Sequence, residues 1–579
     1  MFRLRRFLKN YIFQLIVGPI CKLVEAVLEL MIPLITADII DTGVIKNHDH
    51  DINYVLSRGG LMVLMGALGL CFALVCQKSA SIASQGFGTQ LRNEMFRHIN
   101  TLSHAELDKL GTPSLITRMT NDINQLQWAV AMLIRLVIRA PFLVIGAMIM
   151  AVTIDLRMSL IFFIASPLIA LVLYIIMTGS IPFFKRMQSG LDRVSLLSRE
   201  NLSGNRVIRA FDKQKSEEER FNDCTEELAR TSVRVGRISA LLNPLTYIIA
   251  QGAIIAIVWM GACYVNEGSL STGQIVALVN YMTQILLAMI VVSNLVVVFT
   301  KAAASAARVN EVFDTIPTVT ESAGEAPARV EGAPAVEFKN VSFGYADNGY
   351  ALRNISFTAE KGSVIGIIGG TGSGKSTLVN LITRFYDASE GTVEVYGNDV
   401  KSYPFEALRQ GMGIVPQKAE LFSGTIKSNM LWSKPDADDS DIERALKISQ
   451  AYEFVEKLPE KTDRQITAGG KNLSGGQRQR LTIARALVGE PDILILDDSA
   501  SALDFATDAA LRRALSEETE GMTVFMVSQR VGTVRYADKI LVLDHGELAG
   551  AGTHKELIRG CQVYKEICLS QLRAEEVEE

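Results

Sequence analysis

The chain carries little net charge and few cysteines for its length. Its 579 residues have a formal net charge of −4, and this near balance argues against a nucleic-acid partner, which would need a basic surface. The seven cysteines are scattered, odd in number and without the spacing of metal ligands. They indicate reduced packing residues and argue against a disulfide framework. Internal repeats and low-complexity blocks are also lacking.

Apolar residues, by contrast, are abundant and clustered, at 49% of the chain. A helix needs ~20 mostly apolar residues to cross a bilayer. Six segments reach or approach that length, namely 11–40, 61–76, 133–154, 158–177, 241–265 and 275–298. The basic N-terminus runs into the first of them without the small residues of a cleavage site, so this segment is expected to remain as a span. The sequence therefore predicts a multi-pass membrane protein.

The connections between these spans differ in length and charge. Connection 178–243 is long and carries twelve Lys and Arg residues, whereas 41–56 carries only Lys46. An excess of Lys and Arg marks the cytoplasmic side of a membrane. We therefore expect the long connections, both termini and the C-terminal half in the cytoplasm, with the protein in the cell membrane.

A linker at 317–335, rich in Pro, Ala, Gly and Glu, divides the chain into two parts. The first part, 1–316, contains the six apolar segments and is expected to be an all-α transmembrane domain with cytoplasmic helical extensions. In the second part, 336–579, short β-like runs alternate with helical patterns, which predicts a soluble α/β domain.

A glycine-rich segment of the α/β domain has the spacing of a P-loop, between an apolar strand and a helix. The backbone N–H groups of such a loop surround phosphates, and the following helix start adds partial positive charge. We expect Lys375 to reach the β- and γ-phosphates of ATP and the Ser376 hydroxyl to bind Mg²⁺. The predicted nucleotide-binding residues of this segment are Gly369, Gly370, Thr371, Gly372, Ser373, Gly374, Lys375, Ser376 and Thr377.

Two further segments make the interpretation as a nucleotide-binding domain more specific. The run LSGGQ, with Ser474, Gly475, Gly476 and Gln477, opens a helix and forms a second glycine-rich helix start. Within one domain it has no phosphate to bind, which suggests that it serves the ATP of a neighbouring molecule. The apolar strand 492–496 ends in Asp497, which is suited to hold Mg²⁺ through water.

The P-loop, LSGGQ and an apolar strand ending in Asp, in this order, resemble the ATP-binding cassette domain. Six preceding spans with long cytoplasmic helices resemble the membrane half of ABC exporters. This resemblance implies the type I exporter fold with a domain-swapped dimer, in which each ATP lies between the P-loop of one chain and the LSGGQ of the other.

The same resemblance assigns further residues. It implies that Tyr345 stacks on adenine, although a core tyrosine at a strand end is an alternative for this position. It implies that Gln417 contacts Mg²⁺ and the attacking water. It also predicts short coupling helices at 103–110 and near 212–221.

At two positions the chain departs from the family pattern. It has Asp498 where the hydrolytic Glu is usual, and Gln529 where a switch His is usual. Aspartate is one methylene shorter than glutamate, and proton-transfer partners must lie within ~2.6–3.2 Å. Gln529 can donate a hydrogen bond but cannot carry the charge of an imidazolium. We interpret this as a degenerate ATP site, paired with a second, non-identical half-transporter that carries Glu and His.

Charged residues also occur within the predicted spans. Lys22, Glu25 and Glu29 share one helix face of the first span, and Arg135 and Arg139 lie one turn apart in the third. Each such charge costs ~2.5–3.5 kcal/mol at the bilayer centre. Two interpretations stay open: a polar substrate pathway, whose glutamates would favour cationic, amphipathic cargo, or structural pairing.

Together these patterns predict an ATP-driven exporter of hydrophobic or drug-like compounds that works in contact with membrane lipid. A lipid or peptide exporter is an alternative, and so is a channel-like half that ATP gates without pumping.

Overall fold

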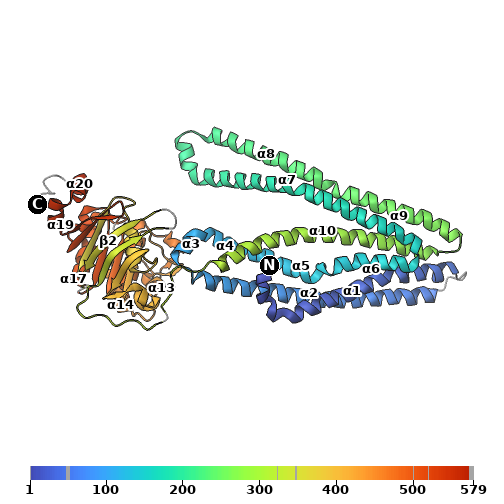
Figure 1. Cartoon of the computed structure of the whole chain (residues 1–579), viewed down its shortest axis with the longest axis horizontal. Coiled ribbons are helices and arrows are strands. Elements are labelled where there is room, and N and C mark those ends of the chain that lie inside the picture. The colour runs from blue at the N-terminus through green and yellow to red at the C-terminus, as the bar shows by residue number, and fades with distance from the viewer. Residues whose placement is uncertain are drawn as a thin grey trace. The chain divides into compact units, whose positions relative to one another are not determined.

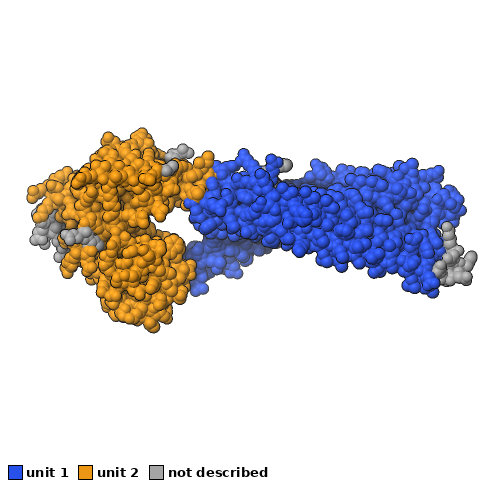
Figure 2. Space-filling model, turned by 90° about the horizontal axis from the view of Figure 1, so that it is seen from below, with its two compact units in different colours: residues 1–100, 112–314 blue, residues 101–111, 315–579 orange. Residues whose placement is uncertain are grey.

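The computed structural model describes residues 2–46, 52–322, 324–345, 349–499, 501–518 and 521–572. The chain divides into two compact units, which Figure 2 shows in different colours. Unit 1 comprises Met1–Asn100 and Thr112–Asp314, and unit 2 comprises Thr101–Gly111 and Thr315–Glu579. The short segment Thr101–Gly111 therefore belongs with the C-terminal unit, although unit 1 flanks it on both sides in the sequence.

The described residues of unit 1 form helices joined by short turns, as Figure 1 shows. Its elements are η1 (Phe2–Tyr11), α1 (Ile12–Asp38), η2 (Ile39–Lys46), α2 (Ile52–Ile99), α4 (Thr112–Thr117), η3 (Arg118–Asp122), α5 (Ile123–Met132), η4 (Leu133–Val137), α6 (Arg139–Ile154), α7 (Leu156–Ala210), α8 (Gln214–Ala240), α9 (Leu242–Asn266) and α10 (Thr272–Asp314).

Five helical stretches among the described residues are long and apolar enough to cross a membrane. They are Ile52–Ile99, Thr112–Ile154, Leu156–Ala210, Gln214–Asn266 and Thr272–Asp314. Helix α1 has 27 residues, but any part of it that could span also contains Lys22, Glu25 and Glu29. A sixth span therefore stays a prediction.

The helices of unit 1 enclose an apolar core to which α1, α6, α7, α9 and α10 contribute. Two contacts fix α10 against α1 and against η2, which follows α1 directly. The Tyr281 hydroxyl donates to the Leu30 carbonyl at 2.7 Å, and the backbone N–H of Gly273 donates to the Asp41 carboxylate at 2.8 Å. Because the later residue of α10 meets the earlier part of α1, the two helices run antiparallel.

Helices α7 and α8 lie side by side along much of their length (Figure 1). Between them, Phe211–Lys213 form a turn in which Asp212 adopts a left-handed conformation, with φ 51°. The coupling helix expected near 212–221 is therefore not a separate element, because the residues after this turn form the start of α8. The left-handed residue ends α7, and the helix-forming residues that follow continue without interruption.

Unit 2 contains two main sheets. The antiparallel sheet has the order β2-β1-β4-β5 and the larger sheet the order β12-β11-β3-β10-β9-β6. In the larger sheet β11, β3, β10, β9 and β6 are parallel, and β12 is antiparallel to β11. The strands are β1 (Val336–Phe343), β2 (Leu352–Ala359), β3 (Val364–Gly369), β4 (Glu390–Val395), β5 (Asn398–Asp399), β6 (Met412–Val415), β7 (Gly424–Thr425), β8 (Gln465–Ile466), β9 (Ile493–Asp497), β10 (Thr523–Val527), β11 (Lys539–Asp544) and β12 (Glu547–Gly552).

Helices cover the sheets and complete unit 2. They are α3 (His104–Leu110), α11 (Lys375–Ile382), η5 (Val400–Ser402), α12 (Phe405–Gln410), α13 (Ile426–Met430), α14 (Asp439–Ile448), α15 (Tyr452–Glu456), η6 (Lys461–Asp463), η7 (Ala468–Gly470), α16 (Gly475–Leu487), α17 (Phe505–Glu518), α18 (Val531–Val534), α19 (His554–Gly560) and α20 (Gln562–Gln571). The parallel strands β3, β9 and β10 are almost fully buried, as expected for central strands covered on both faces.

Aromatic contacts explain why α3 belongs with unit 2. The His104 ring stacks on Phe385 with centroids 4.3 Å apart, and the Tyr386 hydroxyl donates to the Asp108 carboxylate at 2.8 Å. Ser103 caps the helix together with Glu106. Helix α3 coincides with the coupling helix expected at 103–110.

Candidate nucleotide-binding site

The candidate site lies where four parallel strands end. Strand β3 ends at Gly369 in the P-loop, β9 ends at Asp497, β10 ends before Gln529, and β6 ends before Gln417. Since these strands are parallel neighbours, their carboxyl ends meet at one edge of the sheet. Ligands of open α/β sheets bind at this edge. The structure thus brings the P-loop and the Asp497 region together.

The P-loop has the backbone that phosphate binding requires. Gly372 and Gly374 adopt positive φ angles of 81° and 98°. A Cβ atom at Gly374 would lie 2.6 Å from the Leu352 side chain and 2.9 Å from the Ala351 carbonyl oxygen, so only glycine fits there. The helix α11 begins directly after it and directs its N-terminus toward the loop.

Lys375 is buried under the loop. Its ammonium group donates to the carbonyl oxygens of Gly369 and Gly370, at 2.9 and 2.6 Å. Burial lowers the pKa of Lys375, while the nearby carboxylates of Asp498 and Asp497 oppose this shift. The ammonium group therefore lies beside the loop that would hold phosphates, and a bound phosphate would compete with these carbonyls for it.

Oxygen donors suited to Mg²⁺ lie next to the P-loop. The Ser376 hydroxyl donates to Asp497 Oδ1 at 3.1 Å. Burial raises the pKa of Asp497, as does the charge of Asp498, whereas Ser376 and Lys375 lower it. Hydroxyl and carboxylate oxygens are the ligands that Mg²⁺ prefers, and a cation would favour the ionised form of Asp497. The residues present therefore fit a magnesium–nucleotide complex.

Asp498 and Gln417 lie together at the same edge. Gln417 Nε2 donates to Asp498 Oδ2 at 3.4 Å. Asp498 itself adopts a left-handed conformation, with φ 47°, and its backbone N–H donates to the Val527 carbonyl at 3.0 Å. The structure thus places the short carboxylate beside the glutamine that was expected to contact metal and water.

Gln529 is exposed, and its backbone is held by a residue that sequence reasoning missed. Gln571, at the end of α20, donates from Nε2 to the Gln529 carbonyl at 2.8 Å. Its Oε1 accepts the N–H of Val531 at 2.9 Å. The two contacts hold the backbone of residues 529–531. Gln571 is 42 residues away from Gln529, so no pattern near Gln529 in the sequence indicates these contacts.

Tyr345 lies beside the P-loop helix. Its hydroxyl is 3.1 Å from the Thr377 hydroxyl, and its ring meets those of Phe343 and Tyr386 edge to face. The ring is half-buried, which leaves part of it accessible to a nucleobase. Both the adenine-stacking role and the core role remain compatible with this position.

The LSGGQ segment opens α16 with an exposed helix start. The Ser474 hydroxyl accepts the N–H of Gln477 at 3.3 Å, and the Gln477 side chain accepts the N–H of Ser474 at 2.9 Å. A Cβ atom at Gly475 would meet nothing within 4 Å, so its backbone is open to a ligand. Gly476 lies near the Ala502 carbonyl, to which a Cβ atom would be 3.2 Å distant.

Comparisons with known proteins agree with this site. Residues 15–289 match the family model of the ABC transporter transmembrane region, and residues 352–501 match that of the ABC transporter. The uncharacterized ABC transporter ATP-binding protein YfiB of Bacillus subtilis is 36% identical over 570 residues, which are 98% of this chain and 98% of that protein. The chain belongs to the ABC transporter family. Its cassette binds ATP, normally with Mg²⁺.

Other relatives of this ABC transporter cover most of its length. An ABC transporter ATP-binding protein of Mycobacterium tuberculosis is 34% identical over 555 residues, covering 95% of this chain and 94% of the relative. An ATP-dependent lipid A-core flippase of Haemophilus influenzae is 31% identical over 481 residues, covering 82% and 81%. The solved structure of a bacterial Atm1-family ABC exporter with ATP bound has a TM-score of 0.79, 24% identity, and coverage of 98% and 99%. This last likeness shows the fold, an exporter-type helical domain joined to a cassette.

The charges on α1 and near the start of α6 are largely paired in this ABC transporter. Lys22 Nζ lies 2.6 Å from a Glu25 oxygen, and Arg139 Nη2 lies 2.6 Å from a Glu29 oxygen and 4.0 Å from Glu25. Arg135 makes no ion pair among the residues that the structure describes, and its Nε is buried without a hydrogen-bond partner. The glutamates therefore fit the structural interpretation, and their pathway role stays a prediction.

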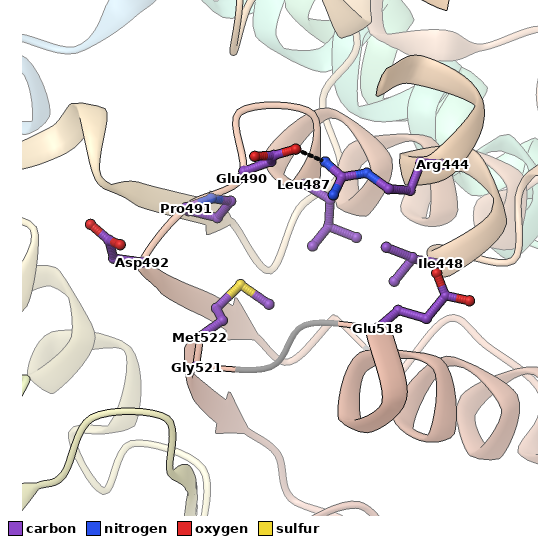
Figure 3. A pocket seen from close by; sticks show the side chains of 9 residues that line it. All are labelled: Arg444, Ile448, Leu487, Glu490, Pro491, Asp492, Glu518, Gly521 and Met522. Atoms are coloured by element: carbon purple, nitrogen blue, oxygen red, sulfur yellow. Dashed lines mark hydrogen bonds and ion pairs between the residues drawn. The ribbon is translucent and has the colours of Figure 1, made fainter. Parts of the chain in front are cut away.

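A separate hollow of unit 2 lies away from the nucleotide site. Figure 3 shows its lining, with Arg444 paired to Glu490. Asp492 and Met522 line it directly before β9 and β10 begin, whereas Asp497 is the last residue of β9 and Gln529 follows the end of β10. The hollow is therefore at the opposite edge of the sheet from the P-loop.

Proposed function

We propose that this chain is one half of a heterodimeric, ATP-driven exporter. It holds the slow or non-hydrolysing ATP site and provides its LSGGQ segment to the active site of the partner. The partner is a second, non-identical half-transporter with Glu and His at the hydrolytic positions. The observation that carries this proposal is the fixed, short carboxylate of Asp498.

The backbone around Asp498 cannot move forward to replace the missing methylene. Its N–H donates to the Val527 carbonyl at 3.0 Å. Its carbonyl accepts from the Ser501 hydroxyl at 2.8 Å and from the Ser501 N–H at 3.2 Å. The carboxylate therefore ends about 1.5 Å short of where a glutamate would reach, which exceeds the tolerance of proton transfer.

At the second hydrolytic position, Gln529 replaces the histidine that is usual in this family. Its neutral amide can donate a hydrogen bond to the γ-phosphate but cannot exchange a proton near neutral pH as an imidazole does. The P-loop, Ser376 and Asp497 remain suited to bind the magnesium nucleotide. A site of this kind binds ATP but hydrolyses it slowly.

The intact LSGGQ segment supports the proposed division of roles between the two chains. Ser474 and Gln477 cap α16 reciprocally, which leaves Gly475 open. A helix start with free N–H groups favours an anion. In a head-to-tail pair, this surface would complete the ATP site whose P-loop belongs to the partner.

The membrane half supports export in a wider sense. We propose six spans, of which α1 is the first, in a domain-swapped dimer. The transmembrane domain (1–316) and the cassette (336–579) are joined by the linker 317–335. The protein lies in the cell membrane, with both termini and the cassette in the cytoplasm. The cargo is a hydrophobic or drug-like compound. Lipid export is the second candidate, which the 31% identity to a protein named as a lipid A-core flippase favours.

Photolabelling distinguishes the two ATP sites directly. The complex purified with its partner would be incubated with 8-azido-ATP carrying ³²P at either the α- or the γ-phosphate, and irradiated. We expect this chain to retain nearly equal α and γ label, and the partner to lose its γ label. Equal loss of γ label from both chains, or brisk ATP hydrolysis by this chain purified alone, would contradict the proposal.

A further inference from the structure

A cluster of charged side chains in the membrane half contains one cation without a counter-ion among the residues that the structure describes. The cluster consists of Lys22, Glu25, Glu29, Arg135 and Arg139. Both glutamates are engaged, Glu25 by Lys22 and Glu29 by Arg139, each at 2.6 Å. Arg135 makes no ion pair with any residue that the structure describes, and its buried Nε has no hydrogen-bond partner.

The surrounding helices cannot provide the missing carboxylate. Element η4, which carries Arg135, packs against α1, α2 and α10. The whole stretch 123–154 contains no Asp or Glu. In α2 the one acidic residue is Glu94, which pairs with Arg97. In α10 the acidic residues Glu311 and Asp314 lie near its end.

Both acidic residues of α10 have partners elsewhere. Glu311 pairs with Arg118 at 3.0 Å, and Asp314 pairs with Arg3 at 2.8 Å. Every carboxylate of the elements around η4 that could meet Arg135 is thus engaged by another cation or lies far along its helix. The buried Nε of this guanidinium is left without an acceptor, and ionisable residues within membrane-spanning stretches mark substrate pathways.

The local backbone also distinguishes this position. Arg135 lies in the π-helical turn η4 (Leu133–Val137), and such turns are frequent at functional sites. A Cβ atom at Gly18 would lie 2.5 Å from the Ile134 side chain, so α1 approaches η4 as closely as glycine permits. The close approach brings the Lys22 face of α1 beside the turn that carries Arg135.

The depth of Arg135 suits the head group of an amphiphile. Helix α6 ends at Ile154, and at 1.5 Å per residue Arg135 lies roughly 28 Å along the helix from that end. The hydrocarbon core is about 30 Å thick. The guanidinium is therefore near one face of the membrane, while the apolar residues beyond it remain available to a hydrocarbon chain.

We propose that Arg135 binds the anionic head group of the cargo, so that the transported compounds are anionic amphiphiles. A guanidinium presents paired N–H donors that match the oxygens of a carboxylate, sulfate or phosphate. The paired glutamates argue against the cationic cargo that the sequence pattern favoured. This inference deepens the proposed export and rests on it.

Binding without ATP tests the inference apart from transport. The full chain, together with its co-purified partner, is placed in phosphatidylcholine nanodiscs. The Kd is measured by fluorescence anisotropy for three probes with the same labelled alkyl chain and a carboxylate, phosphate monoester or trimethylammonium head. We expect both anionic probes to bind more tightly than the cation. A preference for the phosphate alone would support a phospholipid-like source, and equal binding of both anions would support a wider anionic class.

Variants assign the preference to Arg135. We expect Arg135→Gln to weaken anion binding about ten- to hundredfold, which is the worth of a charge-assisted hydrogen bond, and to leave the cation unaffected. Arg135→Lys keeps the positive charge but loses the paired donors, so it should retain the preference for anions at an affinity between those of the parent chain and Arg135→Gln. The matched control is Arg92→Gln, whose guanidinium already donates to Asn124 at 2.6 Å and should not change the preference.

Two results would overturn the inference: equal affinity for all three probes, or unchanged anion binding in Arg135→Gln. ATP-driven uptake of the same probes into inverted proteoliposomes is measured separately. Loss of uptake with intact, Arg135-dependent binding would contradict the proposed export and leave the head-group site standing.

Discussion

Lengthening one side chain should turn the ATP site that we propose to be slow into one that hydrolyses ATP faster. The change is Asp498→Glu, made in the complex with its partner. Because Val527 and Ser501 hold the Asp498 backbone on both sides, the added methylene must extend toward the site and cannot be absorbed by a backbone shift. Gln417, whose amide lies 3.4 Å from the present carboxylate, is in position to share a water with the longer one.

The expected gain follows from general-base assistance, which is worth ~10²–10⁴-fold, or about 3–5 kcal/mol of barrier. Gln529 remains in the single variant, so we expect the lower end, a roughly hundredfold faster loss of γ label from this chain. The assay is the photolabelling ratio of α- to γ-phosphate on this chain over time. Adding Gln529→His should increase the rate further.

The matched control is Asp492→Glu, which lengthens a carboxylate at the opposite end of the same strand, where it pairs with Arg329. It should leave the γ-label half-life unchanged. If Asp498→Glu binds ATP normally and still keeps its γ label as long as the parent chain, the carboxylate length is not what limits hydrolysis, and the reasoning is refuted.

Three further changes test other parts of unit 2. Gly374→Ala should abolish ATP binding, measured by photolabelling of this chain, because its Cβ would lie 2.6 Å from the Leu352 side chain; retained labelling would contradict the close fit. Gln571→Ala should speed hydrogen exchange at the N–H of Val531, which loses its acceptor, while unchanged exchange would show that the α20 contact does not hold this segment. Burial lowers the pKa of His104 in the folded protein. As the pH falls below about 6.5, the histidine is therefore protonated more readily when α3 is undocked than when it is docked. The stability that docked α3 contributes above that pH is then lost. The fall in Tm between about pH 7.5 and 5.5 should therefore be smaller in His104→Phe, and an equal fall would refute this assignment.

The parts of the site that depend on local patterns were predictable from the sequence. A strand, a glycine-rich turn and a helix start are encoded within a few residues, so the positions of Lys375 and Ser376 followed from spacing. Asp497 followed in the same way from the apolar strand before it. The meeting of these residues required only that parallel strands end at one edge of a sheet.

Contacts between distant segments were not predictable in this way. Nothing near Gln529 indicates that Gln571 would bind its carbonyl. In the membrane half, the sequence places Lys22, Glu25 and Glu29 on one face, but it does not state which cation each glutamate takes. Only the three-dimensional arrangement shows that Arg139 reaches Glu29 and that Arg135 is left over.

The membership of Thr101–Gly111 in unit 2 has a practical consequence for work on the cassette alone. A protein produced from residue 315 onward would lack α3, and with it the ring that stacks on Phe385 and the carboxylate that accepts from Tyr386. Phe385 and Tyr386 would then be exposed to water, and an exposed apolar surface favours self-association. An isolated cassette should therefore self-associate, and an added peptide with the sequence of residues 101–111 should return it to the monomeric state.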